Sequence, residues 1–149
     1  MKKINIVFIA IIALFITSCD ENDANLVPRN YFVGTWEASQ IGSLNAIGKV
    51  IYTDYENAGD CTIDNIIFND NFTYTANDYE FEDGACTTSS INGTYTLNGN
   101  NLVLKHIDEF EEVEVIETRR ITNFTFNELE LNYTDSETNQ IVFLKLIKK

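Results

Sequence analysis

The sequence predicts an all-β protein whose strands form an up-and-down antiparallel meander barrel of about eight strands. First, apolar and polar residues alternate in short runs from residue 31 onward, which is the pattern of strands with one buried face. Second, clusters of Gly, Asn and Asp separate these runs at intervals of about 8–12 residues. Third, no substantial helix is indicated beyond an apolar leader. Because each run follows its neighbour through a short turn, a meander is favoured over a Greek key.

The expected strands follow one another along the chain with turn residues between them. The first opens with Gly34-Thr35-Trp36, and Asn69-Asp70-Asn71 suits the hairpin turn between the third and fourth strands. The last strand is apolar on both faces except for Lys145, so we expect it to be covered on both sides or to close the sheet. The expected strands span residues 33–41, 49–55, 63–68, 72–81, 87–97, 102–106, 113–121, 122–133 and 140–147.

The fourth expected strand changes phase along its length. Phe72 and Tyr74 lie on one face of it, whereas Phe81 falls on the other. One extra residue in a strand shifts every later side chain to the opposite face. The sequence therefore predicts a β-bulge near Asn77 and Asp78.

The leader has the layout of a secretory signal peptide. Met1-Lys2-Lys3 is positively charged, and the apolar stretch from Ile4 to Ile16 is 13 residues long, shorter than the roughly 20 that a transmembrane helix needs. Ile16-Thr17-Ser18-Cys19 then resembles the bacterial lipobox. We therefore expect residues 1–18 to be removed and Cys19 to become the acylated first residue.

This leader divides the chain into three parts. Residues 19–30 are expected to form the acylated N-terminus and an acidic tether, and residues 31–149 a single β-barrel domain. The mature chain would carry 8 basic and 23 acidic side chains. Such a negative charge makes nucleic acid an improbable partner. It also means that the lipid on Cys19, rather than charge, would hold the protein at a membrane.

The remaining two cysteines, Cys61 and Cys86, are predicted to form a disulfide. An even number of cysteines in an exported chain indicates this pairing. The rival interpretation is a pair of metal-binding thiolates, but the chain has neither the CxxC spacing nor a nearby histidine. We expect no metal and no cofactor.

The chain shows no pattern typical of an enzyme. His106 is its one histidine, interpreted as a solvated strand-end residue, and no Gly-x-Ser-x-Gly motif accompanies it. Six acidic residues between Asp108 and Glu117 have two interpretations. They could bind a divalent cation or a cationic partner, or they could form a hairpin loop leading into the wet face of an edge strand. The spacing is not that of a calcium loop, which favours the hairpin. We expect a non-catalytic protein.

Several short motifs together resemble the lipocalin-like lipoproteins of Bacteroidota. They are Phe32-Val33-Gly34-Thr35-Trp36, with its Gly-x-Trp opening; Asp60-Cys61 followed by the segment 65–73; Cys86; and the Gly-Thr-Tyr hairpin at 93–104. The resemblance implies a meander barrel, a lipid anchor and an outer-membrane address. The acidic residues after Cys19 are similar to a signal for export to the cell surface, with a periplasm-facing position as the alternative.

The resemblance also implies roles for individual residues. In lipocalins an arginine near the end of the barrel packs over the tryptophan of the Gly-x-Trp motif. By this likeness Arg119 or Arg120 is expected to make a cation–π contact with Trp36. Gly34 and Trp36 are the structural barrel motif.

Two functions remain open from the sequence. An eight-stranded barrel is just wide enough either to fill with side chains or to hold one small ligand. The protein is therefore either a carrier of a small apolar molecule, or a structural or protein-interaction lipoprotein with a filled core. A void of about 300 Å³ or more favours the carrier. The candidate lining residues are the aromatic ones on apolar faces, Phe68, Phe72, Tyr74, Tyr95, Phe124, Phe126 and Tyr133.

Overall fold

A computed structural model of the chain describes residues 29–108, 110–136 and 138–149. The expected signal peptide, the lipidation site Cys19 and the tether as far as Pro28 lie outside the described residues. Among the residues described, no helix is long and apolar enough to cross a membrane. The expectations about the leader therefore stay predictions.

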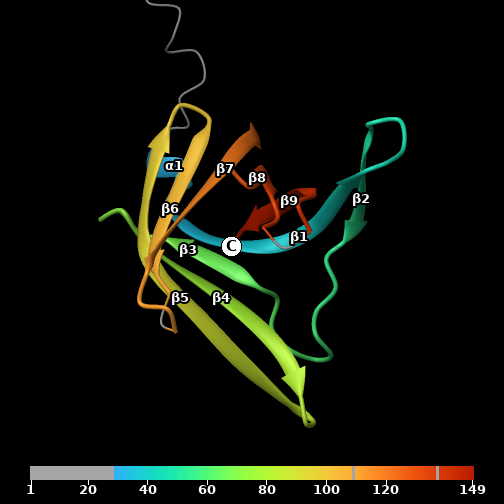
Figure 1. The fold of residues 1–149 in the computed structure, drawn as a ribbon, viewed down its shortest axis with the longest axis vertical. Coiled ribbons are helices and arrows are strands. Elements are labelled where there is room, and N and C mark those ends of the chain that lie inside the picture. The colour runs from blue at the N-terminus through green and yellow to red at the C-terminus, as the bar shows by residue number, and fades with distance from the viewer. Residues whose placement is uncertain (1–28, 109, 137) are drawn as a thin grey trace, which may run out of the picture.

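One short helical turn precedes nine strands (Figure 1). The turn, α1, includes the last two residues of the expected tether, 29 and 30. The elements are α1 (Arg29–Phe32), β1 (Gly34–Leu44), β2 (Val50–Asp54), β3 (Asn65–Phe68), β4 (Thr73–Glu82), β5 (Ala85–Asn98), β6 (Asn101–Ile107), β7 (Glu114–Phe124), β8 (Glu128–Thr134) and β9 (Ile141–Lys148).

The strands form a closed antiparallel barrel, as the sequence predicted. From β3 to β9 each strand pairs with the next, and β9 returns to pair with β1. The other edge of β1 pairs with β3 through residues 34–37 and with β2 through residues 40–44. Eight strands thus close the barrel, and β2 extends it as a hairpin with β1, drawn at the right of Figure 1. The expectation that the last strand closes the sheet is confirmed.

The expected boundary between the seventh and eighth strands, at residues 121 and 122, is wrong. β7 continues to Phe124, and the turn lies at residues 125–127. Thr125 makes this turn because its hydroxyl accepts the backbone N–H of Glu128 at 3.0 Å, while its own N–H donates to the Glu128 carbonyl at 2.8 Å. A register shift between Ile121 and Asn123 keeps the longer β7 in step with β8.

The bulge expected near Asn77 and Asp78 is absent. The pairing of β4 with β5 runs from Thr73 to Glu82 with no register shift. The phase change has another cause: the loop between β2 and β3 packs against Phe81 on the other face of this hairpin. The Phe81 ring packs so closely on Gly59 in this loop that a Cβ at Gly59 would lie 3.0 Å from it.

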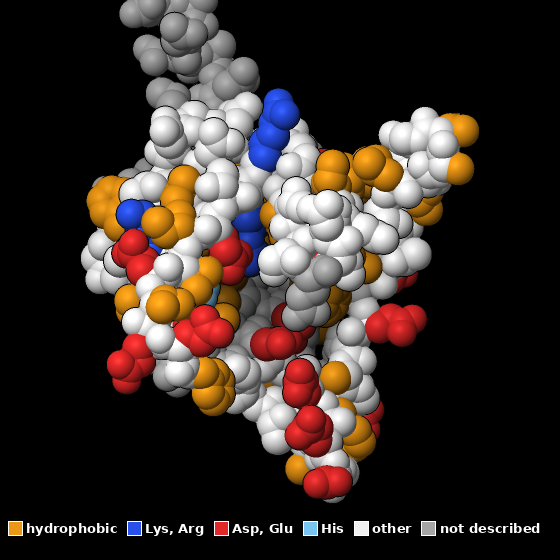
Figure 2. Space-filling model, viewed as in Figure 1, with side chains coloured by type: hydrophobic (Ala, Val, Ile, Leu, Met, Phe, Trp, Pro, Cys, Tyr) orange, Lys and Arg blue, Asp and Glu red, His pale blue; other side chains and the backbone are white. Residues whose placement is uncertain are grey.

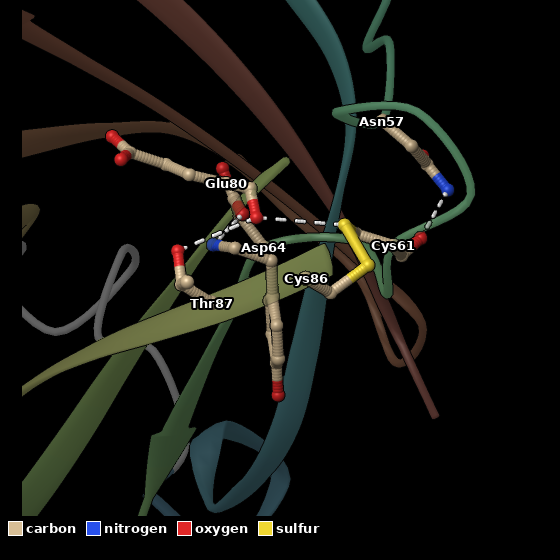
Figure 3. Close-up of a disulfide and its surroundings, with 7 residues drawn as sticks. Asn57, Cys61, Asp64, Glu80, Cys86 and Thr87 are labelled. Atoms are coloured by element: carbon tan, nitrogen blue, oxygen red, sulfur yellow. Dashed lines mark hydrogen bonds between the residues drawn. A yellow bond between two sulfur atoms is a disulfide. The ribbon is translucent and has the colours of Figure 1, made fainter. Parts of the chain in front are cut away.

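The predicted disulfide joins Cys61, in the loop between β2 and β3, to Cys86 near the start of β5 (Figure 3). The sulfur atoms are bonded, and the two Cα atoms lie 5.6 Å apart. Cys86 is the cross-strand partner of Phe81, so the disulfide and the Phe81–Gly59 contact fasten the same loop to the same hairpin. The prediction of a Cys61–Cys86 disulfide is confirmed.

Aromatic side chains fill one end of the barrel, which we call the closed end. Phe32 enters it from α1, with ring centroids 4.4 Å from Phe68 and 5.7 Å from Tyr95. The indole N–H of Trp36 donates to the Phe32 carbonyl at 2.8 Å, which holds α1 on the barrel. Offset and edge contacts of this kind add to the free energy of burial. The buried core consists of Phe32, Trp36, Ala38, Ile66, Phe68, Tyr74, Tyr95, Leu102, Leu104, Ile121, Leu129, Leu131 and Leu146.

A lysine covers the tryptophan of the Gly-x-Trp motif. Lys148 is the cross-strand partner of Trp36, and its Nζ lies 5.3 Å from the centroid of the indole ring. The same Nζ donates to the Tyr31 carbonyl at 2.5 Å. Gly34 leaves room for this side chain, since a Cβ there would lie 2.8 Å from Lys148 Cε. Burial lowers the pKa of Lys148 below its usual value.

The expectation that Arg119 or Arg120 covers Trp36 is therefore wrong. The register of β1 against β9 places Lys148 opposite the tryptophan, and that register cannot be read from the sequence. Arg119 lies instead 4.9 Å over the ring of Tyr133. Arg120 is exposed on β7.

Candidate functional site

The barrel contains a cavity of about 370 Å³ beyond the closed end, open to solvent on one side, and we call it the ligand cavity. Its walls come from β1, β3, β4, β5, β7, β8 and β9, together with the loop that precedes β3. The lining residues are Ala38, Ile41, Tyr55, Asp64, Asn65, Ile66, Ala76, Asn77, Asp78, Ser89, Ile91, Arg119, Tyr133, Leu144 and Leu146.

The cavity exists because inward side chains become smaller away from the closed end. On β1 the buried Trp36 is followed, two residues later, by Ala38. On β4 the buried Tyr74 is followed in the same way by Ala76. Residues two apart on a strand share a face, so each alanine lies where a ring would otherwise continue the core. The space is left empty between aliphatic walls.

One side of the cavity carries a hydrogen-bonded group of polar side chains. The Tyr55 hydroxyl donates to Asp64 Oδ2, and the backbone N–H of Tyr79 donates to Asp64 Oδ1 at 2.8 Å. Burial, and then the hydrogen bond to Asp64, raise the pKa of Tyr55 well above its ordinary value. Asp64 follows Cys61 by three residues, and Figure 3 shows its side chain close to the disulfide. The disulfide thus helps to place this carboxylate.

A second carboxyl group, that of Asp78, lies beside Asp64. Burial, a hydrogen bond that protonated Asp78 can donate to Asp64, and the charge of Asp64 raise the pKa of Asp78 above its ordinary value. Asp78 itself is exposed at the mouth of the cavity. Figure 2 shows further acidic side chains along the lower part of this face, where the β4–β5 hairpin extends. The polar side of the cavity is therefore acidic.

The basic residue in the wall, Arg119, is already paired. Its Nη2 lies 2.8 Å from Glu117 Oε2 and its Nε 3.2 Å from the same oxygen. Its guanidinium stacks on Tyr133. A second hollow of about 450 Å³ shares Arg119 and Tyr133 with the ligand cavity. Arg119 and Tyr133 thus stand between the two spaces.

The structure brings one of the seven candidate aromatic residues, Tyr133, to the ligand cavity. Phe68, Tyr74 and Tyr95 are buried in the core, because their positions on the inward face fall at the closed end. Phe124 packs against that core from the side. The other two candidates lie in turns and are exposed: they are Phe72, with a left-handed φ of 65°, and Phe126. Aliphatic residues, and not the aromatic set, form most of the apolar wall.

His106 has a buried neighbour and is not simply solvated. Its Nδ1 lies 3.1 Å from the hydroxyl of Tyr74, and its side chain is half-buried. Burial raises the pKa of that tyrosine above its ordinary value. His106 therefore gives the hydroxyl of a core tyrosine a hydrogen-bond partner, which is a structural role.

The acidic stretch from Asp108 to Glu117 forms the β6–β7 hairpin loop and the start of β7. Asp108 Oδ1 accepts the backbone N–H groups of Phe110 at 2.8 Å and Glu111 at 2.9 Å, and these bonds lower the pKa of Asp108. β7 pairs with both β6 and β8, so the expectation of an edge strand is wrong. Within the described parts of the chain, no group of three or more His, Cys, Asp or Glu residues is arranged to hold a metal ion.

An eight-stranded meander barrel with a Gly-x-Trp first strand, one closed end and an internal cavity defines a lipocalin-type protein. The family model of the lipocalin-like domain matches residues 32–133. The chain therefore belongs to the lipocalin-like domain family.

The chain is also similar to several solved structures. A complex of bovine odorant-binding protein with a selenium-containing odorant is 18% identical over 83% of this chain and 73% of that chain, with a TM-score of 0.46. A complex of the bovine protein with undecanal is 19% identical over 87% and 77%, with a TM-score of 0.44. A dog lipocalin allergen is 21% identical over 77% and 70%, with a TM-score of 0.40. No curated protein matches the sequence.

Proposed function

We propose that this protein is a non-catalytic carrier that binds one small, largely apolar molecule in the ligand cavity. The observation that supports this is the cavity itself, whose volume of about 370 Å³ lies within the range of small-molecule sites. Its wall combines aliphatic side chains such as Ile66, Leu144 and Leu146 with a few polar groups on one side. This combination is typical of sites that bury a ligand and orient it.

The test is to fill the cavity. N-phenyl-1-naphthylamine, an apolar dye that fluoresces when buried, should bind the protein. The Ala76→Leu variant should weaken this binding at least tenfold, because three additional carbon atoms would project from β4 into the cavity. Ala46→Leu, an exposed substitution in the β1–β2 turn, is the matched control and should leave binding unchanged. Equal dye binding by both variants would contradict the proposal.

The alternative function is that of an interaction lipoprotein without a small-molecule site. The β1–β2 hairpin favours it, because Leu44, Ile47 and Ile51 are exposed there, Ile47 to 85%. Exposed apolar side chains gathered on one hairpin suit a protein partner. A correctly folded protein that binds no dye and carries no extractable apolar molecule from its own host would favour this alternative.

We further propose that the carrier is anchored in the outer membrane by lipid on Cys19 and faces the cell surface. The charged and apolar leader that ends in Ile16-Thr17-Ser18-Cys19, and the acidic residues that follow, support this address. Cys19→Ala should abolish incorporation of radiolabelled palmitate and release the protein from the membrane fraction. Protease treatment of intact cells then separates the two positions: a surface protein is digested, whereas a periplasm-facing one is protected.

A further inference from the structure

The polar side of the ligand cavity is negatively charged. Asp64 is fixed in place because its two oxygens accept hydrogen bonds from the hydroxyl of Tyr55 and the backbone N–H of Tyr79. Asp78 lines the mouth of the same cavity, and the charge of Asp64 acts on it. Two adjacent carboxyl groups repel a ligand with an anionic head group and attract one with a cationic head group.

The basic residue in the cavity wall does not offset this charge. Arg119 is the one Lys or Arg among the described residues that line the cavity. Both its Nε and its Nη2 already bond Glu117, and its guanidinium plane covers Tyr133. A ligand carboxylate would have to displace Glu117 to reach it. The chain as a whole has a net charge of −13, which further disfavours anions.

The rest of the cavity wall is largely aliphatic. Ile66 and Leu146 belong to the buried core, and Leu144 packs against it. An apolar tail against these side chains would be removed from water, while its head group at the mouth would stay beside Asp78. The arrangement therefore suits a molecule with one apolar and one cationic end.

We infer that the ligand cavity binds an amphiphile with a protonated amine head, which Asp78 and Asp64 recognise, and a short apolar tail, which lies against Ile66 and Leu146. This inference rests on the proposed carrier function and adds the chemical class of its ligand. The pair of carboxylates supplies charge-assisted hydrogen bonds to the ammonium group. Asp78 is the main determinant, since the oxygens of Asp64 are already in use.

Three probes with the same tail and different heads test the inference: octylamine, octanol and octanoate. Binding is measured by isothermal titration calorimetry on the full chain in lipid nanodiscs, with empty nanodiscs as the reference for partition into lipid. Octylamine should bind about tenfold more tightly than octanol, a difference of about 1.4 kcal/mol. Octanoate should bind more weakly than octanol.

Two variants assign the preference to its residue. Asp78→Asn should reduce the preference for octylamine over octanol to less than about threefold. Asp83→Asn, the same substitution at the exposed tip of the same hairpin, is the matched control and should keep the full preference.

The outcomes separate this inference from the proposed function. If no probe binds, the carrier function itself is refuted. If octanol binds and octylamine binds no more tightly, or if octanoate binds most tightly, the carrier function stands and the amine inference is refuted. An Asp78→Asn variant that keeps the full preference would equally overturn the role given to this carboxyl group.

Discussion

Loss of the disulfide should cost this domain a large part of its stability. Cys61 and Cys86 close a loop of 25 residues. On the chain-entropy model a loop of this length restricts the unfolded chain by roughly 3.5 kcal/mol at 25 °C. The double variant Cys61→Ala, Cys86→Ala should therefore lower the free energy of unfolding by about 3 kcal/mol. Its midpoint of thermal unfolding should fall by on the order of 10 °C.

The assay is equilibrium urea unfolding, followed by the fluorescence of Trp36. This reporter is buried at the closed end, away from the disulfide, so its signal reports global unfolding. Treatment of the natural chain with a thiol reductant should reproduce the loss. The double variant should not respond to the reductant, which controls for any effect of the reductant elsewhere in the protein.

A loss below about 1 kcal/mol would refute this reasoning. It would mean that the loop between β2 and β3 is already held by its other contacts, such as the Phe81 ring on Gly59 and the hydrogen bonds of Asp64. The double cysteine variant should also bind dye more weakly, because Asp64 lies three residues beyond Cys61 and its loop is then no longer fixed by the disulfide. Unchanged dye binding would show that the loop keeps its position without the disulfide.

Three further predictions concern the barrel wall. Gly93→Ala should destabilise the protein by about 3 kcal/mol or prevent folding, because a Cβ there would lie 2.1 Å from the carbonyl oxygen of Lys105; normal expression and an unchanged midpoint would contradict it. Trp36→Phe should cost roughly 2–4 kcal/mol in urea unfolding followed by circular dichroism, since it removes the bond to the Phe32 carbonyl and leaves a void; a loss under 1 kcal/mol would count against this. Because burial raises the folded-state pKa of Asp78, its contribution to stability is present at low pH and is lost as pH rises through that pKa. Asp78→Asn should therefore stabilise the protein slightly at pH 7, by less than about 1 kcal/mol, and not near pH 3; the opposite order in thermal melts at the two pH values would contradict this.

The strand order could be predicted from the sequence because turn chemistry is local. Asn69-Asp70-Asn71 and Asn98-Gly99-Asn100 separate runs of alternating residues, and the hairpins form where these turns lie. The β7–β8 turn was misplaced because Thr125 and Asn127 act through side-chain hydrogen bonds inside an otherwise strand-like run. Such bonds give no change in hydrophobic periodicity.

The site could be predicted less well, because periodicity identifies the face of a residue but not its depth in the barrel. Tyr95 and Tyr133 both point inward, yet the first fills the closed end and the second lines the cavity. Depth follows from register, which depends on contacts between distant strands. One local signal was present: Trp36 and Tyr74 are each followed, two residues later, by alanine, and these alanines mark where the core stops.

The difference between the filled closed end and the open cavity means that stability and ligand binding make opposite demands on this barrel. The rings at the closed end bury apolar surface completely, whereas Ala76 leaves apolar surface of the cavity unfilled. A leucine at this position would bury additional apolar surface. At about 0.8 kcal/mol for each buried CH₂, this adds up to about 2 kcal/mol to the free energy of unfolding. Ala76→Leu should therefore raise the free energy of unfolding by about 1–2 kcal/mol while it weakens dye binding at least tenfold. We expect this combination of higher stability and weaker binding if the cavity is kept open for a ligand at the expense of packing. A variant that is both less stable and still able to bind would mean that Ala76 is packed as core and that the binding space lies elsewhere.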